Sequence, residues 1–520
     1  MGRSGRLWAV VLLLVSLGLN AWMVTWGLPS TAGWAPDEIL PSAVLDARAR
    51  GFSSGWFDKY PPLHFRVLGA LYAPISGPVR ADAPVPRDVY DRLFRAGRGL
   101  SVVMGASLVL LVYLCGRRLL DEVGALLAAA IVAVMAPFVF YAKLANVDVP
   151  YLFWWALSLL FLLRALETHK PLDYLGLGVA AALAVGTKDQ AYGLYVLVAP
   201  LLVWSRKQRN PDKGWLRAIF SPELMLAAAA GALVLQAIYG LPGNVEGLRA
   251  HLRLISGSAS KDFQEFPNTI AGHAGLLWST ILNTAFVMGV PAFLAALVGV
   301  VLALRRNDAR LPVLLVPAVS YYLFFMMVAL YCYDRFVLPL SILLAFFAGD
   351  VLGRMARRDW IGKGVAGLVL MYGLGRALSV DVLLARDSRF AAEEWLRSNA
   401  SEARVAFVGP PEYLPRSDRL DARTLGPSPD RLEKVAPDYV VTNADYAERA
   451  EDGGAEQALY KGLEAGTLGY RRVWSYRYRS PYMMIRSEDL ADRPGQPLRS
   501  NLDKVNPEIR IYQRESPEER

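Results

Sequence analysis

Two adjacent carboxylates follow the first apolar stretch of the chain, within Gly33-Trp34-Ala35-Pro36-Asp37-Glu38. A carboxylate beside a hydroxyl group can act as its general base, and Asp58 adds a further acid in the same loop. The pair could also attract a divalent cation through oxygen ligands, although nothing in the sequence requires one. A simpler interpretation is that Asp37 and Glu38 begin a helix, since acids stabilise the first helical turn.

Three cations occur at comparable places, each at the end of an apolar segment or just before one: Lys59, Lys188 and Arg335. A charge at membrane depth costs about 2.5–3.5 kcal/mol, so such residues are candidates for function. Together they could bind an anionic lipid head group. Lys59 could instead be an interfacial anchor, and Lys188 could extend to the head groups. Arg335 could do the same or pair with Asp334.

Other polar side chains accompany these charges at the same ends of the apolar segments. Asp148 comes just before Pro150 at the start of a segment and is a further candidate acid, or else a solvated helix cap. Histidines His251 and His273 lack the spacing of metal ligands, so no metal-binding residue is predicted. His64 is more often a packed helix residue than a ligand. The candidate substrate contacts are Tyr60, His64, Asp189 and Tyr333.

The chain as a whole has the composition of a membrane protein. Of its 520 residues, 54% are hydrophobic and 20% are charged. Runs of about 20 apolar residues are typical of membrane-spanning helices, which excludes a soluble enzyme, a disordered chain and a disulfide scaffold. The net charge of +9 needs no nucleic-acid partner, because cytoplasmic loops of membrane proteins are basic. Eleven spans are predicted, near residues 7–26, 98–115, 122–141, 149–166, 172–187, 190–204, 219–240, 276–304, 311–331, 334–353 and 361–380.

We therefore expect an α-helical polytopic membrane domain over residues 1–384 and a soluble α/β domain over residues 385–520. Two loops of the membrane domain, 27–97 and 241–275, are long enough to be functional. The first should contain helices over 37–50 and 63–72. In the α/β domain, helices are predicted over 390–398 and 459–464, and strands over 404–408, 438–442, 471–478 and 508–512.

The distribution of basic residues predicts the orientation. If the N-terminus is cytoplasmic, eighteen basic residues fall in cytoplasmic loops, and the short outer turns hold only Lys143, Lys188 and Arg335. Such a bias is the usual sign of topology. With an odd number of spans, the loops 27–97 and 241–275 and the C-terminal 140 residues are extracytoplasmic. The acids and cations described above then share one side of the membrane.

Five short motifs occur in an order that resembles a known family. They are Asp37-Glu38, Phe57-Asp58-Lys59-Tyr60-Pro61-Pro62, Asn146-Val147-Asp148-Val149-Pro150, Thr187-Lys188 and Arg335-Phe336-Val337-Leu338-Pro339. The set is similar to GT-C glycosyltransferases of the protein O-mannosyltransferase and lipid A aminoarabinose transferase type, over about residues 1–380. The chain departs from the eukaryotic mannosyltransferases in having no room for their large β-trefoil insertion. Its Trp154-Trp155 pair is followed by Ala156, unlike the oligosaccharyltransferase signature.

The resemblance implies a multi-pass enzyme of a bacterial inner (plasma) membrane. Such enzymes move a sugar from a polyprenyl-phosphate carrier to an acceptor hydroxyl or phosphate on a glycan, lipid or protein at the outer face. Asp37 would be the catalytic base, with Glu38 beside it and Asp58 as a second acid. The cations Lys59, Lys188 and Arg335 would hold the carrier phosphate and stabilise its developing charge. One base and one phosphate site imply a single displacement with inversion.

Two other classes of protein share some of these features. A transporter or flippase of lipid-linked sugars would need the phosphate-binding cations but not the paired acids, and internal repeats would be expected in its sequence. No such repeat is evident. A non-catalytic membrane scaffold with an outer binding domain would tolerate substitution of Asp37 without loss of activity.

Overall fold

The computed structural model describes residues 3–51, 60–77, 85–212, 214–257, 261–306, 310–416, 422–450, 453–490 and 496–515. The predicted site residues Asp58 and Lys59 lie outside these ranges. The chain forms two compact units, each built from separate stretches of sequence. The first comprises Met1–Val24, Pro41–Leu378 and Pro497–Arg499, and the second comprises Thr25–Leu40, Ser379–Gln496 and Ser500–Arg520.

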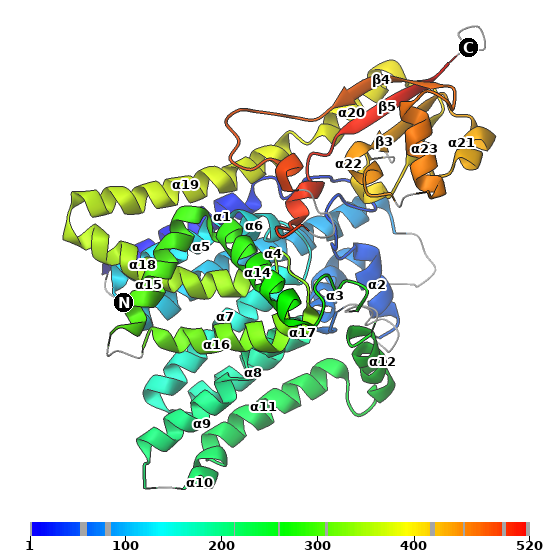
Figure 1. The fold of residues 1–520 in the computed structure, drawn as a ribbon. Coiled ribbons are helices and arrows are strands. Elements are labelled where there is room, and N and C mark those ends of the chain that lie inside the picture. The colour runs from blue at the N-terminus through cyan, green and yellow to red at the C-terminus, as the bar shows by residue number, and fades with distance from the viewer. Residues whose placement is uncertain are drawn as a thin grey trace. The chain divides into compact units, whose positions relative to one another are not determined.

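The first unit is helical (Figure 1). Within the described residues, seven helices are long and apolar enough to cross a membrane, and four apolar helices are shorter, so the predicted number of eleven spans is not confirmed. The helices are α1 (Arg3–Ala21), α2 (Pro41–Ala49), α3 (Leu63–Ser76), α4 (Arg87–Leu119), α5 (Glu122–Ala133), α6 (Ala136–Tyr141), α7 (Asp148–Thr168), α8 (Pro171–Thr187), η1 (Asp189–Leu194), α9 (Val198–Arg209), α10 (Trp215–Ile219), α11 (Pro222–Tyr239), α12 (Val245–Ile255), α14 (Ile270–Met288), α15 (Val290–Leu304), α16 (Leu315–Tyr321), α17 (Met327–Ala329), α18 (Leu338–Arg358) and α19 (Trp360–Ala385), which ends in the second unit.

Several predicted spans are interrupted. The segment predicted as one helix over 276–304 is two helices, α14 and α15, with Gly289 between them at φ +78°. Glycine adopts this backbone conformation without a Cβ clash, and Pro291 cannot donate the next helical hydrogen bond. The predicted span 190–204 is likewise wrong at its start, because residues 189–194 form the 3₁₀ helix η1 and α9 begins only at Val198.

The glycine-rich helix α8 packs closely along α11. A Cβ atom on Gly178 would lie 2.1 Å from the Ala227 carbonyl oxygen, and one on Gly186 would lie 2.5 Å from Ile238 Cδ1. Small residues allow helix backbones this close an approach in membranes. The two contacts advance together along both helices, so α8 and α11 run parallel. The 17 residues of α8 separate its two ends by about 25 Å.

One end of the bundle is held by arginine–carboxylate pairs. These join the end of α4 to the end of α7, the end of α7 to the start of α8, and the end of α15 to α18. Because α7 and α18 run away from Asp148 and Arg335, the pairs lie at the helix ends opposite to those residues. The pairs between helices are Arg118–Glu167 at 2.5 Å, Arg164–Asp173 at 2.6 Å and Arg306–Asp350 at 2.6 Å. Within α18, Arg354 also pairs with Asp350 at 2.9 Å.

The second unit contains a five-stranded sheet in the order β2-β1-β3-β5-β4. β1 pairs in parallel with β2 and β3, whereas β5 runs antiparallel to β3 and β4. Four strands and two helices lie where the sequence predicts them; β2, α21 and α22 were not predicted. The elements are α20 (Ser388–Asn399), β1 (Val405–Val408), β2 (Ala422–Leu425), α21 (Pro429–Val435), β3 (Tyr439–Asn443), α22 (Ala444–Ala447), α23 (Ala455–Glu464), β4 (Tyr470–Tyr476) and β5 (Ile509–Arg514).

Helices cover both faces of this sheet. Successive residues of a strand point to opposite faces, so each strand contributes side chains to two cores. On one face, Val441 and Ile511 pack with Leu396 of α20. On the other face, Val440 and Tyr512 pack with residues of α21 and α23. The second unit is therefore a three-layer α/β/α domain (Figure 1).

A segment from near the N-terminus is built into this α/β unit. Trp26 and Trp34 are buried, and the Trp26 indole donates a 3.1 Å hydrogen bond to Asp387 at the start of α20. The guanidinium carbon of Arg389 lies 4.3 Å from the centroid of the Trp34 ring. Arg416 donates a 2.6 Å hydrogen bond to the Leu28 carbonyl. Residues 25–40 thus pack with residues after 379, which the sequence did not predict.

Candidate active site

A buried ion pair occupies one end of the helical unit. Lys188, which follows α8, donates a 2.5 Å hydrogen bond to Asp148 at the start of α7. The Lys188 side chain is 9% exposed and that of Asp148 is 1% exposed. The interpretations of Asp148 as a solvated cap and of Lys188 as a residue extending to the head groups are therefore wrong. Both side chains turn inward because each charge is compensated by the other.

Arg335 lies near the same aromatic ring as Lys188. The Lys188 ammonium is 5.5 Å from the centroid of Phe336, and the Arg335 guanidinium carbon is 5.6 Å from the same centroid. Arg335 is half-buried, whereas Lys188 is buried. Two of the three predicted cations thus converge although 147 residues separate them in the sequence.

Asp334 is a buried carboxylate beside Arg335. One of its oxygens accepts a 2.7 Å hydrogen bond from the Tyr141 hydroxyl and a 2.6 Å hydrogen bond from the Arg335 backbone N–H. The backbone N–H of Asp334 donates to the Arg499 carbonyl at 3.0 Å. These contacts hold the turn before α18, and with it Arg335, in one position.

Residues Pro497–Arg499 reach this site from the C-terminal part of the sequence. The Pro497 carbonyl accepts hydrogen bonds from Ser279 at 2.6 Å and Asn283 at 2.9 Å. Arg499 pairs with Glu265, and its guanidinium carbon lies 5.4 Å from the Tyr333 ring, the same distance as that of Arg335. Arg499 was not predicted, because nothing in the sequence near residue 499 marks it as part of a membrane site.

Tyr333 itself is almost fully buried, and the guanidinium groups of Arg335 and Arg499 both lie near its ring. Gln190 was also missed: its amide donates to the hydroxyls of Tyr151 at 2.6 Å and Tyr321 at 3.1 Å. Tyr151 also lies 5.5 Å from the Lys188 ammonium. The signal for this polar layer would have been the amide of Gln190 beside Lys188, together with the phenols of Tyr151 and Tyr321 within apolar segments.

The remaining candidate contacts have different surroundings. Both carboxylate oxygens of Asp189 lie 3.1 Å from Nε2 of His251 on α12, so Asp189 positions the second long loop. His64 is buried in α3, where burial lowers its pKa to about 3 and keeps the ring neutral. Its Nε2 atom has no hydrogen-bond partner among the described residues. Tyr60 is half-buried. Contact of any of these residues with a substrate stays a prediction.

Asp37 and Glu38 lie in the second unit, within the segment 25–40. The predicted helix 37–50 is wrong at its start: α2 begins at Pro41, and no acid lies in its first turn. Asp37 has a left-handed backbone conformation, with φ +57°, and both side chains are half-buried. Burial raises the pKa of Tyr413, and the nearby carboxylates of Glu412 and Asp37 act in the same direction. The helix-start explanation of the acidic pair is therefore wrong.

Within the described ranges, no three His, Cys, Asp or Glu side chains gather to hold a metal ion. Asp37 and Glu38 supply two carboxylates, and a divalent cation there would need further ligands from its substrate or water. A cation at this pair stays a prediction.

The fold and site define a polytopic helical membrane protein with a cluster of cations and carboxylates at one end of its helices. A family model described as dolichyl-phosphate-mannose-protein mannosyltransferase matches residues 89–235. The undecaprenyl phosphate-alpha-4-amino-4-deoxy-L-arabinose arabinosyl transferase of Pseudomonas aeruginosa is 31% identical over 206 residues, which are 38% of this chain and 36% of that protein. The match thus spans about a third of the length of these curated relatives.

Two solved structures are similar over most of the chain. The oligosaccharyltransferase of Archaeoglobus fulgidus has a TM-score of 0.50 at 13% identity, covering 92% of this chain and 72% of that one. ArnT from Cupriavidus metallidurans has a TM-score of 0.49 at 13% identity, covering 92% and 97%. The family match and the curated relatives confirm the resemblance to GT-C glycosyltransferases predicted from the ordered motifs, and the oligosaccharyltransferase structure shares the fold.

Proposed function

We propose that this protein transfers a sugar from a polyprenyl-phosphate carrier to an acceptor hydroxyl or phosphate. The observation that carries the proposal is the convergence of Lys188 and Arg335 on one ring, beside the carboxylates of Asp148 and Asp334. A cationic site at the end of membrane helices suits a lipid-linked phosphate. The curated relatives support the choice of carrier, because their names specify undecaprenyl phosphate.

In this mechanism Arg335 is the main phosphate ligand. It is half-buried, so it is accessible to a head group, and its planar fork can contact two phosphate oxygens. Lys188 pairs with Asp148 and adds positive potential near the Phe336 ring. Lys59 is a third candidate ligand. As the bond from sugar to phosphate breaks, these cations stabilise the charge on the departing carrier phosphate, so that no general acid is needed.

The acceptor must lose a proton as it attacks the sugar. We assign this step to Asp37, with Glu38 beside it and Asp58 as a second acid. One base and one leaving phosphate imply a single displacement that inverts the configuration at the sugar carbon. The acceptor is a glycan, a lipid or a protein, and residues outside the phosphate site would select it.

We further propose that the reaction takes place at the extracytoplasmic face of a bacterial inner membrane. Among the residues predicted to be cytoplasmic, Arg118, Arg164 and Arg306 lie at the helix ends opposite to Asp148 and Arg335, where they pair with carboxylates. Positive residues flanking spans favour the cytoplasmic side. The N-terminus would then be cytoplasmic, and the α/β unit extracytoplasmic.

A deletion strain tests the proposed function. Lipid extracts and cell-envelope glycans of the parent, the deletion strain and a complemented strain are compared by mass spectrometry. We expect a polyprenyl-phosphate sugar to accumulate in the deletion strain, and one sugar to disappear from an acceptor. Complementation should reverse both changes. Unchanged lipids and glycans in the deletion strain would contradict the proposal.

Substitution of Arg335 tests the phosphate site. Arg335→Gln should weaken binding of a polyprenyl-phosphate sugar by about 10–100-fold, because a charge-assisted contact contributes about 1.5–3 kcal/mol. Arg335→Lys should restore part of the affinity, since the charge returns without the planar fork. Affinity is measured with purified protein in detergent, and Arg305→Gln, an exposed arginine after α15, is the matched control. Equal affinities of the Arg335 and Arg305 variants would exclude Arg335 as a ligand.

A further inference from the structure

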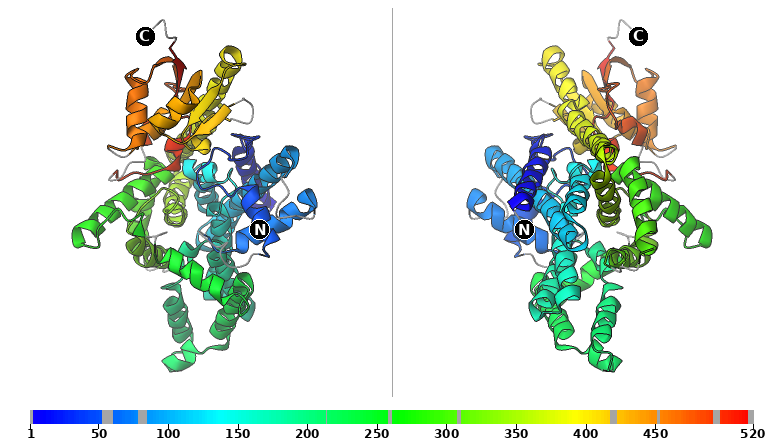
Figure 2. Two further views of the ribbon diagram at one scale, coloured as in Figure 1. Left: turned by 90° about the vertical axis from the view of Figure 1, so that its right-hand side faces the viewer. Right: turned by 90° about the vertical axis from the view of Figure 1, so that its left-hand side faces the viewer.

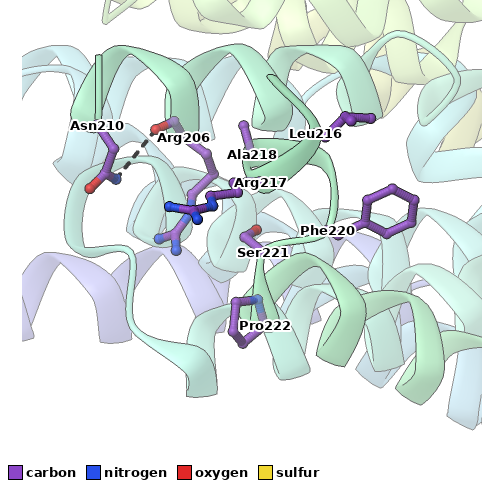
Figure 3. A pocket seen from close by; sticks show the side chains of 8 residues that line it. All are labelled: Arg206, Asn210, Leu216, Arg217, Ala218, Phe220, Ser221 and Pro222. Carbon is purple, nitrogen blue, oxygen red and sulfur yellow. Dashed lines mark hydrogen bonds between the residues drawn. The ribbon is translucent and has the colours of Figure 1, made fainter. Parts of the chain in front are cut away.

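A pocket lies where α9, α10 and α11 meet. It has a volume of about 460 Å³ and is lined by residues at the end of α9, by α10 and by the start of α11. Figures 1 and 2 show α10 at the turn between α9 and α11, and Figure 3 shows the lining side chains. They are Arg206, Asn210, Leu216, Arg217, Ala218, Phe220, Ser221 and Pro222.

Ser221 supplies a buried polar group that the protein leaves without a partner. The residue is 5% exposed, and its hydroxyl has no hydrogen-bond partner among the described residues. Ser221 is the cap residue of the 18-residue helix α11, yet its side chain accepts no hydrogen bond from the first turn. Figure 3 shows the side chain among the residues that line the pocket. An unsatisfied buried hydroxyl is destabilising, and a ligand that hydrogen-bonds to it at this position would remove that cost.

The charges around the pocket favour an anion. Arg206 forms an ion pair with Glu223, and its guanidinium carbon lies 5.8 Å from the centroid of the Tyr174 ring. Its side chain is therefore fixed in position, and its charge is compensated by Glu223. Arg217 is exposed and forms no ion pair with any described residue. The start of α11 adds the positive end of a helix dipole. A phosphate oxygen could therefore contact the Ser221 hydroxyl and the Arg217 guanidinium together.

The surroundings indicate that this anion belongs to a lipid. Exposed Trp204, Trp215, Leu216 and Phe220 flank the pocket on α9 and around α10. Aromatic residues gather in this way where spans meet the membrane interface. Because α8 and α11 run parallel, the start of α11 is about 25 Å from the Lys188 end of α8. The pocket is therefore separate from the candidate active site and belongs to the opposite membrane surface.

We propose that this pocket binds the phosphate of an anionic phospholipid head group, while the flanking aromatic and aliphatic side chains contact the acyl chains. In the orientation proposed above, the site faces the cytoplasmic leaflet, whose anionic lipids attract basic segments. The proposal requires no sugar transfer, so it can be tested separately from the proposed function.

Lipid binding to the purified full-length protein is the test. The delipidated protein in a neutral detergent is titrated with dioleoylphosphatidylglycerol, dioleoylphosphatidylcholine or inorganic phosphate, and bound lipid is counted by native mass spectrometry. We expect one phosphatidylglycerol to bind with at least tenfold preference over phosphatidylcholine. Ser221→Ala should weaken this site by about 2–10-fold and Arg217→Gln by about 3–10-fold. Arg305→Gln, an exposed arginine outside the pocket, is the matched control and should bind like the parent.

Three outcomes would overturn the proposal. Equal binding of the two lipids would exclude recognition of the anionic head group. Equal losses in the Arg217 and Arg305 variants would mean that binding reflects general surface charge. Displacement of phosphatidylglycerol by inorganic phosphate at similar concentration would assign the pocket to free phosphate. Ser221→Ala removes one hydroxyl and should fold normally, which an unchanged thermal unfolding temperature would verify.

Discussion

Replacement of Asp37 by asparagine should reduce the rate of sugar transfer by about 10²–10⁴-fold, while binding of the polyprenyl-phosphate donor is retained. Asparagine has the size of aspartate but no basicity, so the acceptor hydroxyl would keep its proton. The substitution is also suited to the backbone. Asp37 has φ +57°, a conformation that Asn and Asp adopt more readily than other residues. An alanine variant would instead combine the loss of the base with backbone strain.

Transfer and donor binding are measured on the same purified preparations of parent and variant. The matched control is Glu38→Gln, which removes the neighbouring half-buried carboxylate from a residue without the left-handed backbone. A transfer rate of Asp37→Asn within about threefold of the parent would remove Asp37 from the role of base. If Glu38→Gln alone loses activity, the base is the second acid of the pair.

The second large effect concerns the buried pair of Lys188 and Asp148. Lys188→Met should destabilise the protein by about 3–5 kcal/mol, because it leaves Asp148 as an uncompensated buried charge. The double variant Lys188→Met with Asp148→Asn should recover a large part of this loss, since no charge remains to be compensated. The free energy of unfolding is measured by denaturant titration in mixed micelles.

An exposed ion pair on the same chain is the control for this comparison. Arg249 and Glu246 are 2.7 Å apart, and their side chains are 62% and 71% exposed. Arg249→Gln should change the free energy of unfolding by less than about 1 kcal/mol. If Lys188→Met costs no more than Arg249→Gln, Asp148 is not a buried charge. If the double variant is no more stable than Lys188→Met, the pair stabilises by packing rather than by charge.

Most of the apolar helices could be predicted because apolar length is a local property, whereas the predicted number of eleven spans is not confirmed. The sequence places the apolar segments correctly but misses breaks such as Gly289, where a glycine and a following proline end one helix and begin the next. These two residue types were a visible signal. The segment was nevertheless predicted as one helix, because it is apolar throughout and hydropathy alone does not distinguish one helix from two.

The site was predictable as a set of residues but not as a set of contacts. Lys188 and Arg335 were selected because charges at span ends are costly, and both lie near the ring of Phe336. The pairing of Lys188 with Asp148 depends on how α7 and α8 pack, which no local pattern contains. The same holds for Arg499, which reaches Asp334 from a stretch of irregular chain. Asp37 was selected by type, while the packing of its segment in the second unit depends on contacts of Trp26 and Trp34 with the distant residues Asp387 and Arg389.

Recombination between relatives is constrained by two contacts of the N-terminal segment. Arg389 stacks on Trp34, and Trp26 donates a hydrogen bond to Asp387. A chimaera with its crossover near residue 385 would divide the α/β unit, because Thr25–Leu40 would come from one parent and the residues that bury Trp26 and Trp34 from the other. Domain exchange must carry Thr25–Leu40 along with the C-terminal portion. The short stretch Pro497–Arg499 belongs with the helical parent, since it packs on Asn283 and Asp334. The units that could be exchanged between relatives are therefore discontinuous in sequence. The acidic pair Asp37-Glu38 would be exchanged together with the α/β unit.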